Sequence, residues 1–60
     1  ALIKALKDQS EHVRIRAAFA LGQMGPKAKQ AIPALTERLN DETRLVREYA
    51  AFAIERLKSV

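Results

Sequence analysis

The chain repeats itself at an interval of 33 residues, and this internal repeat restricts its fold more than any other feature. Of the 27 residue pairs that the shift aligns, ten are identical, where chance would give about one or two. Residues 17–20 align with 50–53, and Val13-Arg14 aligns with Val46-Arg47. Periods of about 20–50 residues are typical of solenoids, so each unit is predicted to stack on the next.

Each unit is predicted to contain two helices. Apolar residues recur at helical spacing, alanine is abundant, and Gly and Pro number only two each, which favours close-packed helices over sheets. We expect the first helices to cover about residues 1–7 and 27–40, and the second helices about 11–24 and 44–59.

Short polar turns separate the two helices of each unit. Ser10 and Thr43 are plausible N-caps for the helices that follow, with Asp8 and Asp41 as alternatives.

Gly25 and Pro26 mark the boundary between the units. Gly25 suits the left-handed conformation that follows a helix, and Pro26 can begin the next helix because an N–H is not needed there. Pro33 lies inside the apolar pattern of the third helix. Because it removes one backbone hydrogen bond, we expect it to kink that helix or to delay its regular start.

Residues 6–25 followed by 31–35 resemble the HEAT repeat, and the bacterial, phycobilisome-lyase-like branch most closely. The resemblance covers the whole chain. It rests on Asp8, Val13, Arg14, Ala17, Ala18, Leu21, Gly22, Gly25, Ala31, Ile32, Pro33, Ala34, Leu35, Leu39, Asp41, Val46, Arg47, Ala50 and Ala51. It implies an all-α solenoid fragment of two stacked helical hairpins, four helices in total, and it says little about function.

The resemblance also suggests how the chain divides. We expect a single domain, residues 1–60, with a first repeat over about 1–25 and a second over about 26–60. The first repeat lacks a counterpart of 27–33, so we expect it to be truncated. Gly22 and Gly25 are replaced by Glu55 and Lys58 in the second repeat, which suggests a natural C-terminal end, since terminal repeats are often atypical.

Composition limits the remaining classes of function. The net charge is +4 and is concentrated in residues 1–33, which permits acidic partners or nucleic acid without requiring either. There is no Cys, so disulfides and thiolate metal sites are excluded, and a reducing, cytoplasmic setting is favoured. No apolar run approaches the roughly 20 residues that span a bilayer.

Candidate catalytic groups have a simpler structural explanation. Asp8, Ser10 and His12 are close in sequence, but a catalytic triad requires a pocket that excludes water, and an exposed turn has none. Glu48 and Glu55 lie two helical turns apart, which is better explained by solvated charge than by a paired-carboxylate site. We therefore expect no catalytic residue, no metal site and no cofactor, and a protein that is not an enzyme.

One position carries Asp in both units, Asp8 and Asp41, and another carries Arg in both, Arg14 and Arg47. In HEAT proteins the matching Asp and Arg form a ladder between neighbouring repeats, which implies one structural ion pair here. The sequence leaves open whether Asp8 pairs with Arg47 or Asp41 with Arg14.

The second helix of each unit has an expected core face and an expected binding face. A helical projection places Val13, Ala17, Ala20, Leu21 and Met24 together, which predicts the core. In a HEAT solenoid the other side of these helices lines the concave surface. The predicted partner-binding residues there are His12, Ile15, Arg16, Phe19, Gln23, Leu45, Glu48, Tyr49, Phe52 and Arg56.

The aromatic residues of this face have two interpretations. Phe19 and Phe52 are counterparts one unit apart, so their rings are predicted to lie side by side, either as binding surface or as a plug in the groove between the helices.

We expect a protein–protein interaction scaffold or adaptor that binds another protein or neighbouring HEAT repeats, with homo-oligomers possible and no membrane partner. Nucleic-acid binding through the scattered Lys and Arg residues is the alternative. A non-catalytic subunit of a chromophore lyase is implied by the resemblance alone.

Overall fold

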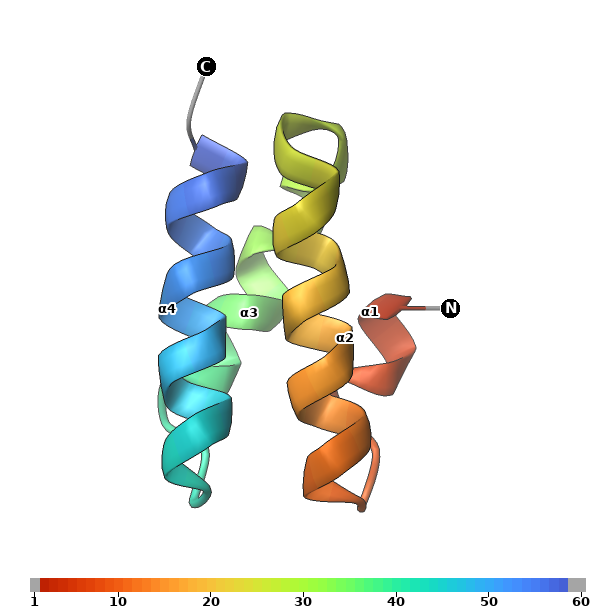
Figure 1. Ribbon diagram of the computed structural model, residues 1–60, viewed down its shortest axis with the longest axis vertical. Coiled ribbons are helices and arrows are strands. Elements are labelled where there is room, and N and C mark those ends of the chain that lie inside the picture. Colours follow the sequence, from red (N-terminus) through yellow and green to blue (C-terminus); the bar gives the residue numbers. More distant parts are fainter. Residues whose placement is uncertain (1, 59–60) are drawn as a thin grey trace.

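The computed structural model describes residues 2–58, and every regular element in this range is helical. In chain order these elements are α1 (Leu2–Ala5), α2 (Glu11–Met24), the 3-10 segment η1 (Gly25–Ala31), α3 (Ile32–Arg38) and α4 (Arg44–Lys58). Helices α2 and α4 lie side by side and run in the same direction, with α3 behind them, and α1 flanks α2 on the side away from α4 (Figure 1). The all-α arrangement of stacked hairpins expected from the repeat is confirmed.

Both second helices begin where the sequence predicts. Helix α2 has the expected bounds, and α4 is described as far as Lys58, so its predicted end at Ser59 lies outside the described residues. Ser10 occupies the N-cap position of α2, but its side chain makes no capping hydrogen bond. The carboxylates of Asp8 and Asp41 order the two turns instead, because each accepts the backbone N–H two residues ahead, at 2.9 and 2.8 Å.

The first helices are shorter than the sequence suggests. Helix α1 ends at Ala5, and 3-10-type bonds continue the chain to Asp8. In the second unit regular α-helix begins only at Ile32, with Pro33 in its first turn, so this proline delays the helix rather than kinking it. The preceding chain forms a 3-10 segment that is interrupted by non-helical angles at Ala28.

The boundary between the units has the positive φ expected at Gly25, but not a left-handed helical conformation. Gly25 ends α2 with a φ of 67° and a ψ of −150°, which glycine adopts without steric cost but which lies outside the left-handed helical region. Pro26 follows in the first turn of η1, where the missing N–H is no loss. The chain therefore changes direction at Gly25, where α2 ends and η1 begins.

Small side chains allow α2 and α4 to pack closely. Ala17, Ala18, Ala50 and Ala53 are all buried, and none of them holds the helices apart. Larger side chains fill the space behind this contact, and those that are fully buried are Leu6, Leu35, Leu57 and Val46. The core is therefore a thin layer between the two second helices and the first helices.

The predicted core face of α2 is partly wrong. Ala17 and Leu21 are buried, but Ala20 is only half-buried, and Val13 and Met24 are exposed. The buried face of α2 is turned towards Ala18 and Gly22, because α4 packs on that side, whereas the short helix α1 leaves Val13 and Met24 exposed. In α4, which packs against both α2 and α3, the predicted pattern holds and the buried residues are Val46, Ala50, Ala53 and Leu57.

Candidate functional site

The exposed side of α2 and α4 carries three aromatic rings that contact one another, named here the aromatic cluster: Phe19, Tyr49 and Phe52. The Phe19 and Phe52 rings are stacked, with centroids 6.1 Å apart and planes inclined by 14°. Tyr49 meets both edge-on, at 6.0 Å from Phe19 and 6.5 Å from Phe52. The two phenylalanines thus lie side by side, as their separation by one unit predicts.

The aromatic cluster packs against α2 at Gly22, which has no side chain to exclude the Phe52 ring. A Cβ atom at this glycine would lie 2.7 Å from Cε2 of Phe52 and 3.3 Å from the Cα of Ala53, so the ring occupies the space that a side chain would fill. Phe52 nevertheless remains 37% exposed and Phe19 44% exposed. The rings therefore fill part of the groove between α2 and α4 and also present apolar area to solvent.

Charged side chains border the aromatic cluster. The guanidinium carbon of Arg56 lies 5.8 Å from the centre of the Phe52 ring, within the range of a cation–π contact. Arg16 and Ile15 line a shallow hollow of about 370 Å³ next to Phe19 and Tyr49. Glu48 and the three rings line a second, almost entirely apolar hollow of about 220 Å³.

The remaining predicted site residues lie further from the rings. His12, Gln23 and Leu45 are exposed on the same two helices, but they line neither of these hollows. Leu45, at 51%, is the most exposed of the large apolar residues in the described chain. The structure thus brings together Ile15, Arg16, Phe19, Glu48, Tyr49, Phe52 and Arg56, and leaves the other three apart.

A buried ion pair joins the two units at the turns that precede α2 and α4. Nη2 of Arg14 donates to Oδ1 of Asp41 at 3.3 Å, and Nε lies 3.0 Å from Oδ2, although that N–H does not point at the oxygen. The same Nη2 also reaches the Thr43 hydroxyl at 3.4 Å. Of the two pairings that the sequence left open, the structure therefore has Arg14 with Asp41, and not Asp8 with Arg47.

Arg38 is a further partner of Asp41 that the sequence analysis missed. Its Nη1 donates to Oδ2 of Asp41 at 3.2 Å from three residues earlier in the chain. The spacing alone could have suggested this contact, since residues three apart in a helical turn are neighbours. Burial raises the pKa of Asp41, but the N–H of Thr43 and the charges of Arg14 and Arg38 outweigh it, so the pKa lies below its ordinary value of 3.8.

The turn that carries Asp8, Ser10 and His12 is open to solvent. All three residues are exposed, and the carboxylate of Asp8 accepts the N–H of Ser10. Residues 2–58 contain no group of three or more His, Asp or Glu side chains placed to hold a metal ion. Among the helices described, none combines the length and the hydropathy that a membrane span requires.

The comparisons with known proteins give one finding. The family described as HEAT repeats matches residues 1–60. The comparisons with curated proteins and with solved structures find no match. Since the family match extends over the full sequence, and the fold is that of two stacked helical hairpins joined by an Asp–Arg pair, the chain belongs to the HEAT repeat family.

Proposed function

We propose that this chain is a non-catalytic scaffold or adaptor module that binds another protein through the exposed side of α2 and α4. HEAT repeats generally mediate protein–protein interaction, and the proposal assigns this role to one surface. The observation that carries it is the aromatic cluster, whose Phe19 and Phe52 rings remain 44% and 37% exposed although each packs on other rings.

The composition of this surface fits protein recognition. Aromatic and Arg side chains are enriched in the residues that contribute most to binding at protein interfaces. Here Arg16 and Arg56 flank the rings on two sides. The rings also fix one another, so they lose little conformational freedom when a partner covers them. We infer that the partner contributes an apolar side chain, which enters the hollow lined by the rings and Glu48.

Nucleic-acid binding is the competing function, and the ion pairs weigh against it. Three of the arginines already contact carboxylates: Arg14 and Arg38 contact Asp41, and Arg44 contacts Glu48 at 3.0 Å. These arginines are less available to phosphate groups, whose neutralisation gives most of the affinity for nucleic acid. A role in a chromophore lyase is a finer proposal that rests only on the resemblance to that branch of the family.

A selection from a displayed peptide library tests the proposed function, with the purified chain as bait. The peptides recovered should bind the wild-type chain and should lose about tenfold or more in affinity for Phe19→Ala, a change typical of residues central to an interface. Leu45→Ala is the matched control, because Leu45 is more exposed than Phe19 and stands apart from the cluster. Thermal melting of each variant separates lost binding from lost folding.

Two results would contradict the proposal. In the first, Leu45→Ala and Phe19→Ala weaken binding equally, so that the aromatic cluster has no special role. In the second, the chain binds labelled DNA or RNA with an affinity that falls steeply as salt is raised, and binds no peptide, which is the behaviour of a phosphate-binding surface.

A further inference from the structure

The six arginines of the chain differ in whether the chain itself supplies a partner for their charge. Within residues 2–58, four of them donate to carboxylate or carbonyl oxygens: Arg14, Arg38, Arg44 and Arg47. Arg16 and Arg56 have no such partner in this range, and both are exposed. These two are also the arginines that border the aromatic cluster. Positive charge without a partner in the described chain is therefore gathered around the rings.

Arg16 and Arg56 lie at opposite ends of the aromatic cluster. Helices α2 and α4 run in the same direction (Figure 1), and the Phe19 and Phe52 rings are stacked on each other. Arg16 comes three residues before Phe19 on α2, whereas Arg56 follows Phe52 by four residues on α4. At a rise of about 1.5 Å per residue, the two arginine backbones are separated by about 10 Å along the helices. A ligand that covers the rings thus meets a positive charge at each end.

Both arginines keep their hydrogen-bond donors available beside the rings. The guanidinium carbon of Arg56 lies 5.8 Å from the centre of the Phe52 ring. An arginine attracted to a ring face still has its N–H groups, which lie in the plane of the guanidinium and match the two oxygens of a carboxylate. Arg16 is exposed and lines the hollow beside Phe19 and Tyr49. Each arginine can therefore donate to a carboxylate while an apolar side chain covers the rings.

The negative charge near the rings is offset by a neighbour. Among the residues of the described chain that line the two hollows, Glu48 alone has a carboxylate. Its Oε2 accepts a hydrogen bond from Nε of Arg44 at 3.0 Å, one helical turn away. The surface around the aromatic cluster is therefore positive, and it attracts an anionic partner.

A cationic ligand is the other chemistry that three rings and a carboxylate can bind. The spacing of the rings opposes it, because the centroids of Phe19 and Phe52 are 6.1 Å apart. An ammonium group held between two ring faces needs about 7 Å or more. The charges of Arg16 and Arg56 also repel a further cation. Ring geometry and charge thus both favour an acidic ligand.

We propose that the protein bound under the proposed function, on which this inference rests, presents an acidic segment to the aromatic cluster. In this segment a large apolar side chain is flanked on both sides by Asp or Glu. The apolar side chain covers the rings, and the two carboxylates pair with Arg16 and Arg56. The site lies over the contact between α2 and α4, since residues of both helices line each hollow.

The separation of the arginines also gives the spacing of the acidic residues. An extended peptide rises about 3.3 Å per residue, so carboxylates about three or four residues apart span the distance of about 10 Å. The apolar residue then lies between them in the sequence. This spacing distinguishes the segment from one that is merely rich in acidic residues.

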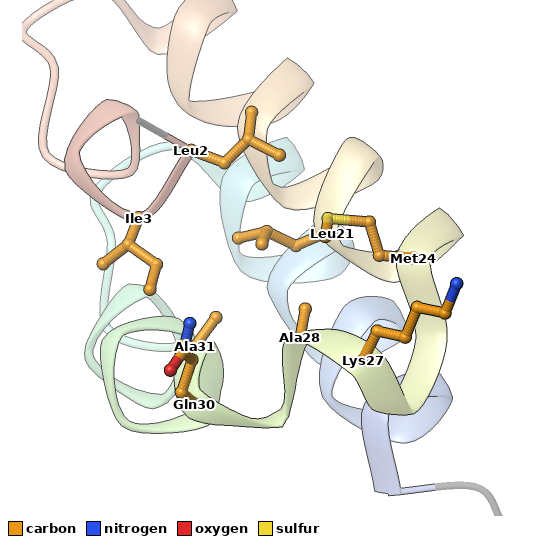
Figure 2. Close-up of a pocket in the computed structure, with 8 residues that line it drawn as sticks. All are labelled: Leu2, Ile3, Leu21, Met24, Lys27, Ala28, Gln30 and Ala31. Carbon is orange, nitrogen blue, oxygen red and sulfur yellow. The ribbon is translucent and has the colours of Figure 1, made fainter.

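Another apolar hollow of the chain provides a control. It has a volume of about 280 Å³ and opens between α1, the end of α2 and η1. Figure 2 shows Met24 of α2 and Ala28 of η1 around it, with Lys27 beside them. Of the residues that line it in the described chain, Lys27 alone is charged. Lys27→Gln therefore removes a charge next to an apolar surface without changing the aromatic cluster.

The displayed peptide library tests the proposal when three forms of the full chain are used as bait. The first is wild type, and the second carries Arg16→Gln with Arg56→Gln. The third carries Lys27→Gln with Lys29→Gln, and it has the same net charge as the second. All four substituted side chains are exposed, so each form should stay folded, which circular dichroism checks.

The recovered sequences should depend on the two arginines. On wild type, they should be enriched in pairs of Asp or Glu that enclose an apolar residue at the spacing given above. The enrichment should persist on the third bait and disappear on the second. Replacing both acidic residues of a recovered peptide by Gln or Asn should weaken its binding to wild type about tenfold, since each exposed ion pair contributes about two- to fivefold. The same replacement should change binding to the second bait by about twofold or less.

Two results would overturn the acidic partner while the proposed function stands. In one, peptides that depend on Phe19 are recovered, but they show no preference for Asp or Glu, or they prefer Lys and Arg. In the other, both variant baits lose the enrichment equally, so that net charge rather than the two arginines attracts the peptides. If no recovered peptide depends on Phe19, the proposed function and the acidic partner are both wrong.

Discussion

Asp41 is the residue on which most of the polar contacts between the units converge. It is 8% exposed and accepts hydrogen bonds from the Thr43 N–H, Arg14 and Arg38. A buried carboxylate is costly unless its charge is neutralised and its oxygens are hydrogen-bonded, and here both conditions are met. The charge of this group therefore makes the fold sensitive to two kinds of change, in the arginine and in pH.

Replacing the arginine should destabilise the chain severely. Arg14→Met leaves Asp41 buried with only Arg38 as its ionic partner, and breaking one side of a buried pair costs about 3–5 kcal/mol. A core of this size supplies about the same amount, so we expect little helix to remain at room temperature. Circular dichroism with urea titration measures the loss.

Two control variants separate the loss of the buried Arg14–Asp41 ion pair from the general effect of removing an arginine charge. Arg44→Met disrupts the exposed pair with Glu48 and should cost about 0.5 kcal/mol or less. The double variant Arg14→Met with Asp41→Asn removes the buried charge and should be more stable than Arg14→Met alone. If the double variant is no better, Asp41 is not what makes Arg14 necessary.

Acid should weaken the fold through Asp41. Its pKa in the folded chain lies below 3.8, whereas the unfolded chain has the ordinary value. Between these two values the unfolded state binds the proton and the folded state does not, so the free energy of unfolding falls as pH falls. The contribution is complete above about pH 4–5 and is lost below the folded pKa.

Urea unfolding at several pH values measures this slope. In Asp41→Asn the slope between pH 4 and the acid limit should be smaller than in wild type, because the shifted group is gone. Glu48→Gln is the control, since Glu48 is exposed, and it should leave the slope nearly as in wild type. Equal slopes in wild type and Asp41→Asn would mean that other carboxylates account for the acid sensitivity.

At the scale of elements, α4 packs closely against α2 at Gly22. Helical Gly→Ala substitutions normally gain about 1 kcal/mol from helix propensity. At Gly22 the added Cβ meets the Phe52 ring at 2.7 Å and the Cα of Ala53 at 3.3 Å. The ring can swing away, but the backbone of Ala53 belongs to a packed helix, so we expect Gly22→Ala to lower the melting temperature.

Repeating Gly22→Ala in a chain that lacks the Phe52 ring tests whether a steric clash causes the lower melting temperature. In Phe52→Ala the ring is absent, so the same Gly22→Ala change should lose most of its penalty, and the difference between the two backgrounds measures the clash. A stabilising Gly22→Ala in the wild-type chain would show that the two helices have room to separate.

Helix positions were predictable from the sequence to different degrees. Helix α2 has the predicted bounds because a polar turn precedes it and Gly25 ends it, and both signals act locally. The extent of η1 was not predictable, since apolar spacing does not distinguish 3-10 from α geometry around Pro33. The core face of α2 was misjudged at Val13 and Met24 because helical spacing identifies an apolar face without saying whether a neighbour covers it.

The candidate site was predictable where the repeat relates its residues. Phe19 and Phe52 lie side by side because they hold one position in successive units. The place of Phe52 over Gly22 was not predictable, since it depends on how closely α2 and α4 approach. Nor could the sequence choose between the two Asp–Arg pairings, because both are related by the same repeat.

As a whole molecule, the chain has a thin core for its length, and we expect marginal stability. Six of the eleven buried apolar residues in the described chain are alanines, which remove little apolar surface from water. Solenoid units gain stability mainly from contact with neighbours, and about three or more are usually needed. At low protein concentration the melting temperature should therefore lie below about 65 °C, the upper range for mesophilic domains.

Calorimetry at several protein concentrations checks this expectation. If copies of the chain associate, the melting temperature should rise with concentration, because binding that is specific to the folded state stabilises it by mass action. A cooperative transition well above 65 °C in dilute solution would show that two units suffice.

The bond from Arg47 to the carbonyl of Asp41 has a kinetic consequence. Because Nη1 is already held at 2.7 Å by its own turn, the guanidinium does not have to search for a productive rotamer after an encounter. A surface preset in this way docks as a rigid body, so its association rate is limited by collision and orientation rather than by rearrangement. Substitutions of the surface residues around Arg47 should then change mainly the lifetime of a complex formed there and leave the rate of its formation nearly constant.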